Sequence, residues 1–333
     1  MRLQLGYVPL CDAAPLIVAH EFGFARAEGL DLDLSAEPSW ATLRDRLALG
    51  HLDGAHMLAP LALASRFALS GPPSDLIVPL QLSRDGNAIT LSHGLWAEME
   101  PAGTTLDAIA RAFARVAQVR REAGRPLTLG TVHPFSCHTY QLRLFAEAGG
   151  LDPSAFRTVV VPPQHSVEAL ARNLVDGFCA GAPWNAVAAA AGHGHVAVLG
   201  SLLAPDAPEK VLAVSERLDG ALPPLIRAVA RAGRWCADPD NRTELVHRLI
   251  RRNYLDLDAT LVGAAFAQDA SAETTAGVHL RFGAAIQEPD LRCGRWILRQ
   301  MRLSQQIAAP DVQDAGVATV FRPDLYRRAT TDL

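Results

Sequence analysis

Lysine is almost absent from this chain of 333 residues. Lys210 is the only lysine among 31 lysine and arginine residues, so arginine carries nearly every positive charge. A lysine ammonium is a compact charge with three rotatable donors, whereas an arginine presents a planar fork. Either a coding bias toward arginine left Lys210 by chance, or its position requires a compact ammonium.

Other absences each exclude a class of protein. No apolar run reaches the roughly 18 residues that cross a bilayer, so we expect no membrane partner. The net charge of −4, without a basic run, argues against direct nucleic-acid binding. The five cysteines are widely spaced and form no C-x-x-C, which predicts free thiols and neither a zinc site nor a disulfide framework. We expect no metal and no cofactor.

The first residues bear on the compartment. Met1 and Arg2 lead directly into the apolar segment 3–8, with no basic n-region, apolar h-region or cleavage site. Together with the unpaired cysteines, this favours a cytoplasmic protein, unless a leader peptide has been removed. The apolar content of 49% is that of an ordinary globular protein.

One short segment occurs twice and organises the chain. Residues 52–60 read L-D-G-A-H-M-L-A-P, and residues 175–183 read V-D-G-F-C-A-G-A-P. Asp-Gly is typical of a tight turn before a buried strand, and Ala-Pro suits the first turn of a helix. Upstream of each copy, L-x-L-G-x-V occurs at residues 3–8 and 127–132. A repeat this long predicts two similar α/β lobes.

The repeat also gives expected limits for the lobes. We expect residues 1–87 to form the first part of lobe I and residues 88–205 to form lobe II. Residues 206–333 are expected to return to lobe I and to add C-terminal helices and a tail. Two crossings of the chain between lobes make a hinge around a cleft, which is the geometry of a protein that closes on a ligand.

Five residues are candidates for this cleft because they lie at strand–helix junctions or at the crossings: Trp40, Asn87, His138, Gly181 and Lys210. Ligands bind at the carboxyl ends of strands in open α/β sheets. The four side chains and the Gly181 backbone N–H are donors, and we expect no carboxylate pair among them. Donors without acceptors suit a small anion such as nitrate, which favours binding over catalysis. Trp40 could instead be a core aromatic, and His138 a structural histidine.

Several motifs recur in the order of a known family. They are S-W-A-T-x-R-D (39–45), D-G-A-H-M-L-A-P (53–60), G-N-A-I-T-L-S (86–92), V-V-V-P-P (159–163), F-C-A-G-A-P-W (178–184) and P-E-K-V-L-A-V (208–214). Over about residues 1–305 the chain resembles the nitrate- and bicarbonate-binding branch of the ABC-transporter solute-binding proteins. The resemblance implies a type II periplasmic-binding-protein fold, with a helical C-terminal region.

The same resemblance implies roles for individual residues. It assigns nitrate contacts to Trp40, His138, Gly181 and Lys210. Lysine at the last of these positions points to nitrate or nitrite, because bicarbonate-binding relatives have an acidic residue there that helps to hold calcium. Asn87 stands where exported members often have glutamine, and its shorter amide changes the fit to an anion.

A member of this family without a leader most resembles the cytoplasmic NasS-type nitrate/nitrite sensors. Those sensors bind an ANTAR-type RNA-binding antiterminator (NasT-like) and release it when the anion binds, which implies a regulator of nitrate assimilation. Two alternatives remain. One is a periplasmic nitrate receptor of an ABC transporter, with its leader removed. The other is an enzyme on the same scaffold, similar to relatives in thiamin-pyrimidine synthesis, for which His133, Cys137 and His138 are the catalytic candidates.

Overall fold

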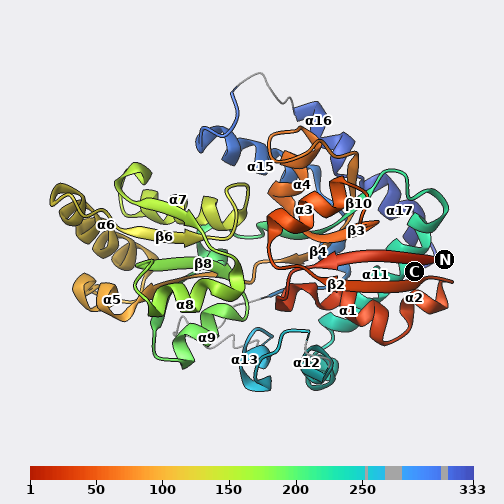
Figure 1. Cartoon of the computed structure of the whole chain (residues 1–333), viewed down its shortest axis with the longest axis horizontal. Helices are drawn as coiled ribbons and strands as arrows, with labels where there is room; N and C mark the ends of the chain where they lie inside the picture. Colours follow the sequence, from red (N-terminus) through yellow and green to blue (C-terminus); the bar gives the residue numbers. More distant parts are fainter. Residues whose placement is uncertain (252–253, 267–279, 309–313) are drawn as a thin grey trace.

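The computed structural model describes residues 1–251, 254–266, 280–308 and 314–333. Its strands form two five-stranded sheets, each with helices packed around it (Figure 1). The chain passes from the first sheet to the second between β4 and β5, and it returns between β9 and β10. The two-lobe α/β fold that the sequence predicts is therefore confirmed.

The first sheet, in lobe I, has the strand order β2-β1-β3-β10-β4. The first three of these strands are parallel, and β10 runs antiparallel to both of its neighbours. The strands are β1 (Arg2–Tyr7), β2 (Asp31–Ala36), β3 (Gly54–Leu58), β4 (Leu76–Arg84) and β10 (Pro208–Ser215). Between them lie helices α1 (Ala14–Glu21), α2 (Phe24–Ala27), α3 (Trp40–Ala48) and α4 (Ala59–Arg66).

The second sheet, in lobe II, has the equivalent order β7-β6-β8-β5-β9. Here β5 takes the place of β10, because it runs antiparallel to β8 and β9. The strands are β5 (Asn87–Ser92), β6 (Thr128–Thr131), β7 (Arg157–Val160), β8 (Gly177–Gly181) and β9 (Gly194–Leu199). The helices are α5 (His93–Met99), α6 (Leu106–Glu122), α7 (Cys137–Ala148), α8 (Ser166–Ala171), α9 (Trp184–Ala190) and α10 (Gly200–Leu203).

The repeated Asp-Gly turn has the same structural role in both lobes. Asp53 accepts a hydrogen bond from the Gln4 N–H at 2.8 Å, and Asp176 accepts one from the Thr128 N–H at 2.8 Å. β3 then pairs with β1 from its first residue, and β8 pairs with β6 from its first residue. The carboxylate thus fixes the register at which each third strand joins the first, so the predicted repeat is a structural one.

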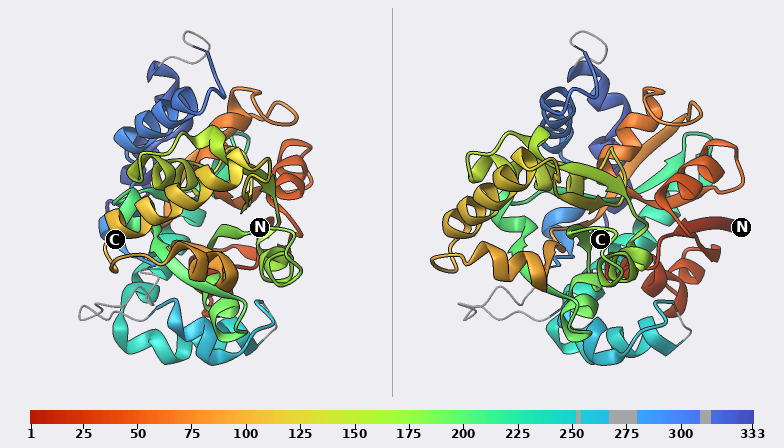
Figure 2. Two further views of the ribbon diagram at one scale, coloured as in Figure 1. Left: turned by 90° about the vertical axis from the view of Figure 1, so that its left-hand side faces the viewer. Right: turned by 60° about the vertical axis from the view of Figure 1, so that its left-hand side comes forward.

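The C-terminal region is helical, as the sequence predicts. Its helices are α11 (Leu222–Ala237), α12 (Arg242–Arg251), α13 (Ala259–Ala264), α14 (Ala284–Gln287), α15 (Leu291–Leu303), α16 (Asp314–Val320) and α17 (Pro323–Thr330). Figure 2 shows α15 and α16 at the top of the molecule and α12 and α13 at the bottom. The tail docks on lobe I, where Phe321 is buried and bridges to Val78 of β4.

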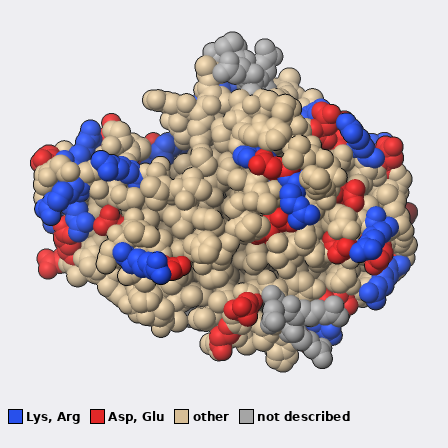
Figure 3. Space-filling model, viewed as in Figure 1, with Lys and Arg blue, Asp and Glu red and all other residues tan. Residues whose placement is uncertain are grey.

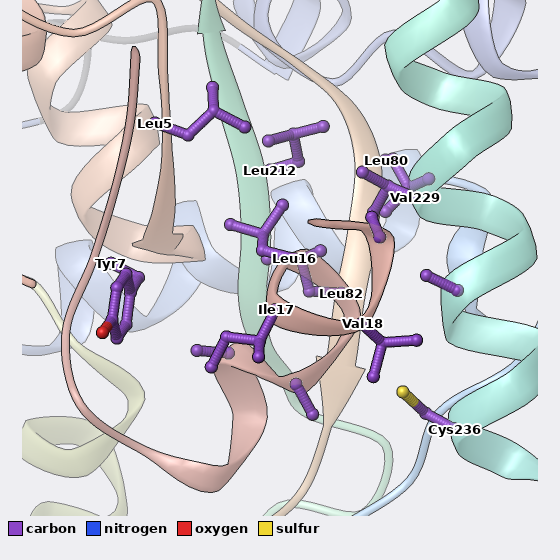
Figure 4. Close-up of a cluster of buried hydrophobic side chains, with 14 of the residues drawn as sticks. Leu5, Tyr7, Leu16, Ile17, Val18, Leu80, Leu82, Leu212, Val229 and Cys236 are labelled. Carbon is purple, nitrogen blue, oxygen red and sulfur yellow. The ribbon is translucent and has the colours of Figure 1, made fainter. Parts of the chain in front are cut away.

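A buried apolar cluster fixes the first helix on the first sheet. Leu5, Leu80, Leu82 and Leu212 of the sheet pack with side chains of α1 and α11; the latter include Leu16, Ile17, Val18, Val229 and Cys236 (Figure 4). This packing also holds the short turn between β1 and α1, a 3-10 segment at Cys11–Ala13 that carries Asp12. The turn faces lobe II, since the Cys11 N–H donates to the Ala182 carbonyl at 3.0 Å.

Candidate anion-binding site between the lobes

The five candidate residues come from both lobes. Trp40 is the first residue of α3, Lys210 lies on β10, and His138 lies in the first turn of α7. Asn87 begins β5 and pairs with Gly181 at the end of β8. The side chains of Trp40, Asn87, His138 and Lys210 are at most 1% exposed. They therefore lie in the interior, where each polar group needs a partner.

Two serine caps fix the starts of α3 and α7, the helices that carry Trp40 and His138. The Ser39 hydroxyl accepts a hydrogen bond from the Thr42 N–H at 3.1 Å, and Ser136 accepts one from the Thr139 N–H at 3.2 Å. A capped helix begins at a defined residue. Trp40 and His138 consequently lie in the first turns of two helices, α3 after β2 in lobe I and α7 after β6 in lobe II.

The expectation that this site holds donors without carboxylates is wrong. Asp12 Oδ2 lies 3.0 Å from Lys210 Nζ, and Glu209 Oε2 lies 3.6 Å from it. The other Asp12 oxygen lies 2.8 Å from Nε2 of His56, a residue of β3. Asp12 is 2% exposed, and the other three are fully buried. An isolated buried ammonium is costly, and the two carboxylates compensate its charge.

Burial and mutual charge set the protonation of these groups. Burial acts to raise the pKa of Asp12, but Lys210 and His56 lower that pKa to about 2. Burial acts to lower the pKa of Lys210, but Asp12 and Glu209 raise it above its ordinary value. Burial raises the pKa of Glu209 to about 7, against the opposing effect of Lys210. The site thus contains an ammonium, a carboxylate, and a second carboxyl group that titrates near neutral pH.

Buried donors remain without a protein partner. Within the part of the chain that the structure describes, Trp40 Nε1 and both ring nitrogens of His138 make no hydrogen bond. Burial, with the nearby Lys210 charge, holds the pKa of His138 well below its usual range, so the ring is neutral and has one N–H donor. The ammonium of Lys210 has three donors, and its two carboxylate neighbours leave at least one. The Lys210 Nζ also lies 5.8 Å from the centre of the Trp40 ring. These groups suit an acceptor-rich ligand.

The Asn87 amide directs its N–H donors away from Trp40, His138 and Lys210. Its Nδ2 donates to Glu209 Oε2 at 2.6 Å and to Gln141 Oε1 at 3.0 Å. The Asn87 Oδ1 makes no hydrogen bond within the described residues. A Cβ placed on Gly181 would lie 3.5 Å from this oxygen and 3.4 Å from Asp12 Oδ2. Asn87 therefore presents an acceptor toward Gly181 and Asp12 instead of the expected donor.

Sequence reasoning did not identify Asp12 or Glu209. Asp12 follows the carboxyl end of β1, a position that itself indicates a ligand site in α/β sheets. Glu209 gave no such signal, because adjacent residues of a strand normally face opposite sides. The register between β10 and β4 shifts on both sides of Lys210, and this irregularity allows Glu209 and Lys210 to share one site.

The enzyme alternative finds no support in these side chains. The Cys137 thiol donates to the Pro208 carbonyl at 3.3 Å, and burial raises its pKa well above the usual range. A nucleophilic cysteine needs a lowered pKa. Neither candidate histidine is bonded to this thiol: His133 Nδ1 accepts the Phe135 N–H at 3.1 Å, and the ring nitrogens of His138 make no hydrogen bond within the described residues.

Two further features bear on possible partners. Among the described residues, no group of three or more His, Cys, Asp or Glu side chains is arranged to hold a metal ion. Within the same residues, no helix is long and apolar enough to cross a membrane. On the face in Figure 3, acidic and basic residues are interspersed and gather mainly toward the two ends of the molecule, without an extended basic stripe.

Comparison with known proteins identifies the family, because residues 1–250 match the NMT1-like family. The chain belongs to this family. It is 30% identical over 348 residues to the "Nitrate/nitrite binding protein NrtA" of Synechococcus elongatus, an alignment that covers 98% of the chain and 77% of that relative. It is 33% identical over 341 residues to the "Bicarbonate transport ATP-binding protein CmpC" of the same species, covering 100% of the chain and 50% of the relative.

Several curated relatives are thus about twice as long as this chain, which spans about half of their length. Among solved structures, the periplasmic nitrate-binding protein NrtA from Synechocystis PCC 6803 matches with a TM-score of 0.88 at 27% identity. That match covers 100% of the chain and 89% of NrtA. The chain therefore belongs to the nitrate- and bicarbonate-binding branch of ABC-transporter solute-binding proteins, as its motifs indicate. NrtA and CmpC both carry the names of binding or transport proteins.

Proposed function

We propose that this protein binds a small oxyanion, nitrate or nitrite, between its two lobes. The observation that carries the proposal is the buried Lys210 ammonium beside the unpartnered donors of Trp40 and His138. Nitrate accepts hydrogen bonds through all of its oxygens and donates none, so it complements these groups. Enclosure strengthens each contact by lowering the local dielectric. The similarity to NrtA, which is named for nitrate and nitrite binding, supports the same ligand.

Contacts between the lobes support closure around the ligand. The Gln164 Nε2 of lobe II donates to the Pro38 carbonyl of lobe I at 2.6 Å. Gln141 of α7 donates through Nε2 to Glu209 Oε1 of β10 at 3.1 Å. These bonds form only when the lobes are together, so a ligand that fits the closed form shifts the population toward it.

Calorimetric titration tests this function. Nitrate, nitrite, bicarbonate and sulfate are titrated into the wild type, Lys210→Met and the control Arg172→Met, whose side chain at the end of α8 is 69% exposed. We expect nitrate or nitrite to bind the wild type and the control, and to lose measurable binding in Lys210→Met. If neither anion binds the wild type, the proposed ligand is wrong, and binding of bicarbonate alone would replace it.

We further propose that the protein is a cytoplasmic nitrate/nitrite sensor that releases an ANTAR-type, NasT-like antiterminator when the anion binds. The support for this role is the resemblance of its motifs to the nitrate- and bicarbonate-binding branch, of which the NasS-type sensors are cytoplasmic members. Linkage requires the anion to prefer the conformation that binds the antiterminator less well. Affinity capture with a NasT-like protein tests it, and nitrate is expected to reduce capture by the wild type but not by Lys210→Met.

A periplasmic receptor of an ABC transporter is the second candidate, and the similarity to NrtA favours it. The two candidates share the anion site and differ in the partner. A receptor is expected not to bind the antiterminator and to stimulate nitrate uptake through its transporter. Failure of capture at every nitrate concentration would therefore contradict the sensor and leave the anion site intact.

A further inference from the structure

We propose that Glu209 is a proton-linked switch of the anion site: anion binding protonates Glu209, and the protonated side chain turns the Asn87 amide so that it donates to the anion. This inference rests on the proposed function and specifies how the same site is regulated. It assigns a positioning role to Glu209 and couples anion binding to the uptake of one proton from solvent.

The balance of charge in the enclosed site explains why anion binding leads to the uptake of a proton. The ammonium of Lys210 is already matched by Asp12 at 3.0 Å, and Glu209 lies 3.6 Å from the same ammonium. All three side chains are at most 2% exposed, so solvent screens them weakly. An incoming anion adds a negative charge beside two carboxylates. Protonation of one carboxylate removes the excess, because like charges in one buried site disfavour joint ionisation.

Geometry selects Glu209 over Asp12 as the proton acceptor. Asp12 has two basic neighbours, since its oxygens face Lys210 Nζ and His56 Nε2 at 3.0 and 2.8 Å. Glu209 has only the longer contact to Lys210, and its remaining partners are the neutral amides of Asn87 and Gln141. A side-chain amide can present either its NH₂ donor or its acceptor oxygen by rotating, whereas a lysine ammonium has donors only.

The amide of Asn87 provides that exchange. With Glu209 ionised, its carboxylate accepts from Asn87 Nδ2 at 2.6 Å, so the amide oxygen faces Gly181 and Asp12. Once Glu209 carries a proton, its O–H needs an acceptor, and a rotation of the Asn87 amide by a half-turn supplies Oδ1. The same rotation directs Nδ2 toward Gly181, into the site. Gln141 Nε2 keeps its bond to the other Glu209 oxygen, but the rotation removes the bond from Asn87 Nδ2 to Gln141 Oε1 and leaves that oxygen with the Cys179 thiol as its donor. The new bond from Asn87 Nδ2 to the anion must offset the loss, so the rotation occurs only when the anion is bound.

Other titratable groups around Glu209 could also take up a proton, and the test must separate them. They come from the turn after β1, from the β4–β5 crossing and from β3, α7, β8 and β10, and they are Asp12, His56, Asp85, Cys137, His138, Cys179 and Lys210. Burial raises the pKa of both thiols, which are already protonated. Burial lowers the pKa of both histidines, so a histidine is the main competing site.

Glu209→Gln isolates the switch. The introduced amide can donate to a rotated Asn87 Oδ1 while its oxygen accepts from Gln141, so the variant imitates the protonated state. Glu168→Gln is the matched control, because this side chain of α8 is 55% exposed. Nitrate is titrated calorimetrically at pH 6 to 9 in HEPES and in Tris, whose different ionisation enthalpies reveal the number of protons exchanged.

For the wild type and the control we expect uptake of about one proton per nitrate near pH 8, with affinity falling up to about tenfold per pH unit above neutrality. Glu209→Gln is expected to bind nitrate with no proton uptake and no such pH dependence. Asn87→Leu should weaken binding more at pH 6, where the amide donates to the anion, than at pH 9.

Four results decide the proposal. Absence of proton uptake by the wild type overturns it, even if Glu209→Gln fails to fold. Proton uptake that persists in Glu209→Gln also overturns the proposal, because another group then takes up the proton. An equal effect of Asn87→Leu at all pH values contradicts the amide rotation. Absence of nitrate binding by the wild type at every pH overturns the proposed function itself.

Discussion

Lys210→Met is expected to destabilise the protein and to abolish anion binding, for two separable reasons. Methionine keeps a side chain of similar length but removes the ammonium, which leaves Asp12 and Glu209 without their common counter-charge. Asp12 is 2% exposed and lies 3.0 Å from the lost nitrogen. Removing one partner of a buried ion pair costs about 3–5 kcal/mol, because the remaining charge is left uncompensated. Urea unfolding at pH 7 measures this loss.

The double variant Asp12→Asn/Lys210→Met separates stability from binding. Without the aspartate charge, most of the lost free energy of unfolding should return, because replacing both members of a buried pair is often close to neutral. Nitrate binding should remain lost, since the ammonium is still missing. Recovery of nitrate affinity in the double variant, or an unchanged stability in Lys210→Met, would refute the reasoning.

Three further predictions concern single positions. Trp40→Phe removes the unpartnered indole N–H and should weaken nitrate binding about tenfold, as calorimetry will show; the smaller ring also leaves a cavity in the core, so urea unfolding should report a loss of stability. Glu209→Gln should be more stable than the wild type at pH 8 but not at pH 4.5. The pKa of Glu209 rises on folding from 4.5 to about 7, so the folded state holds the extra proton. The free energy of unfolding of the wild type then falls by about 3 kcal/mol as the pH rises from 4.5 through about 7. Thermal unfolding at a series of pH values can follow this change. Arg281→Gln removes ion pairs to Asp85 and Asp206 at the two crossings and should cost about 1 kcal/mol in urea unfolding.

Controls for these predictions use exposed positions. Arg292→Gln, whose side chain is 85% exposed, should leave stability unchanged when Arg281→Gln lowers it. Equal stability of the wild type and Glu209→Gln at pH 8 would contradict the buried, partly ionised state of Glu209. An unchanged nitrate affinity in a folded Trp40→Phe variant would contradict the contact between the indole N–H and the anion.

Much of the architecture was predictable because it repeats in the sequence. The Asp-Gly turns at Asp53 and Asp176 hold equivalent strands through equivalent hydrogen bonds, so two matching patterns predict two matching lobes. The gathering of Trp40, His138 and Lys210 follows from the same logic, because strand ends of both sheets face one another. The local sequence pattern was therefore sufficient to predict the position of a residue wherever that position depends only on the residue's own strand or helix.

The electrostatics of the site were not predictable in this way. Glu209 faces the same site as Lys210 only because the pairing of β10 with β4 changes register beside it. The orientation of the Asn87 amide depends on Glu209 and Gln141, which are distant in sequence and meet through the fold. Such contacts depend on tertiary packing, and no spacing along the chain encodes them.

A crystal structure of the protein grown with nitrate tests the central claim most directly. We predict density for a planar anion between the lobes, within hydrogen-bond distance of Lys210 Nζ and Trp40 Nε1, and beside a ring nitrogen of His138. An anion bound elsewhere, or closed lobes with no anion at saturating nitrate, would contradict the assignment of this site.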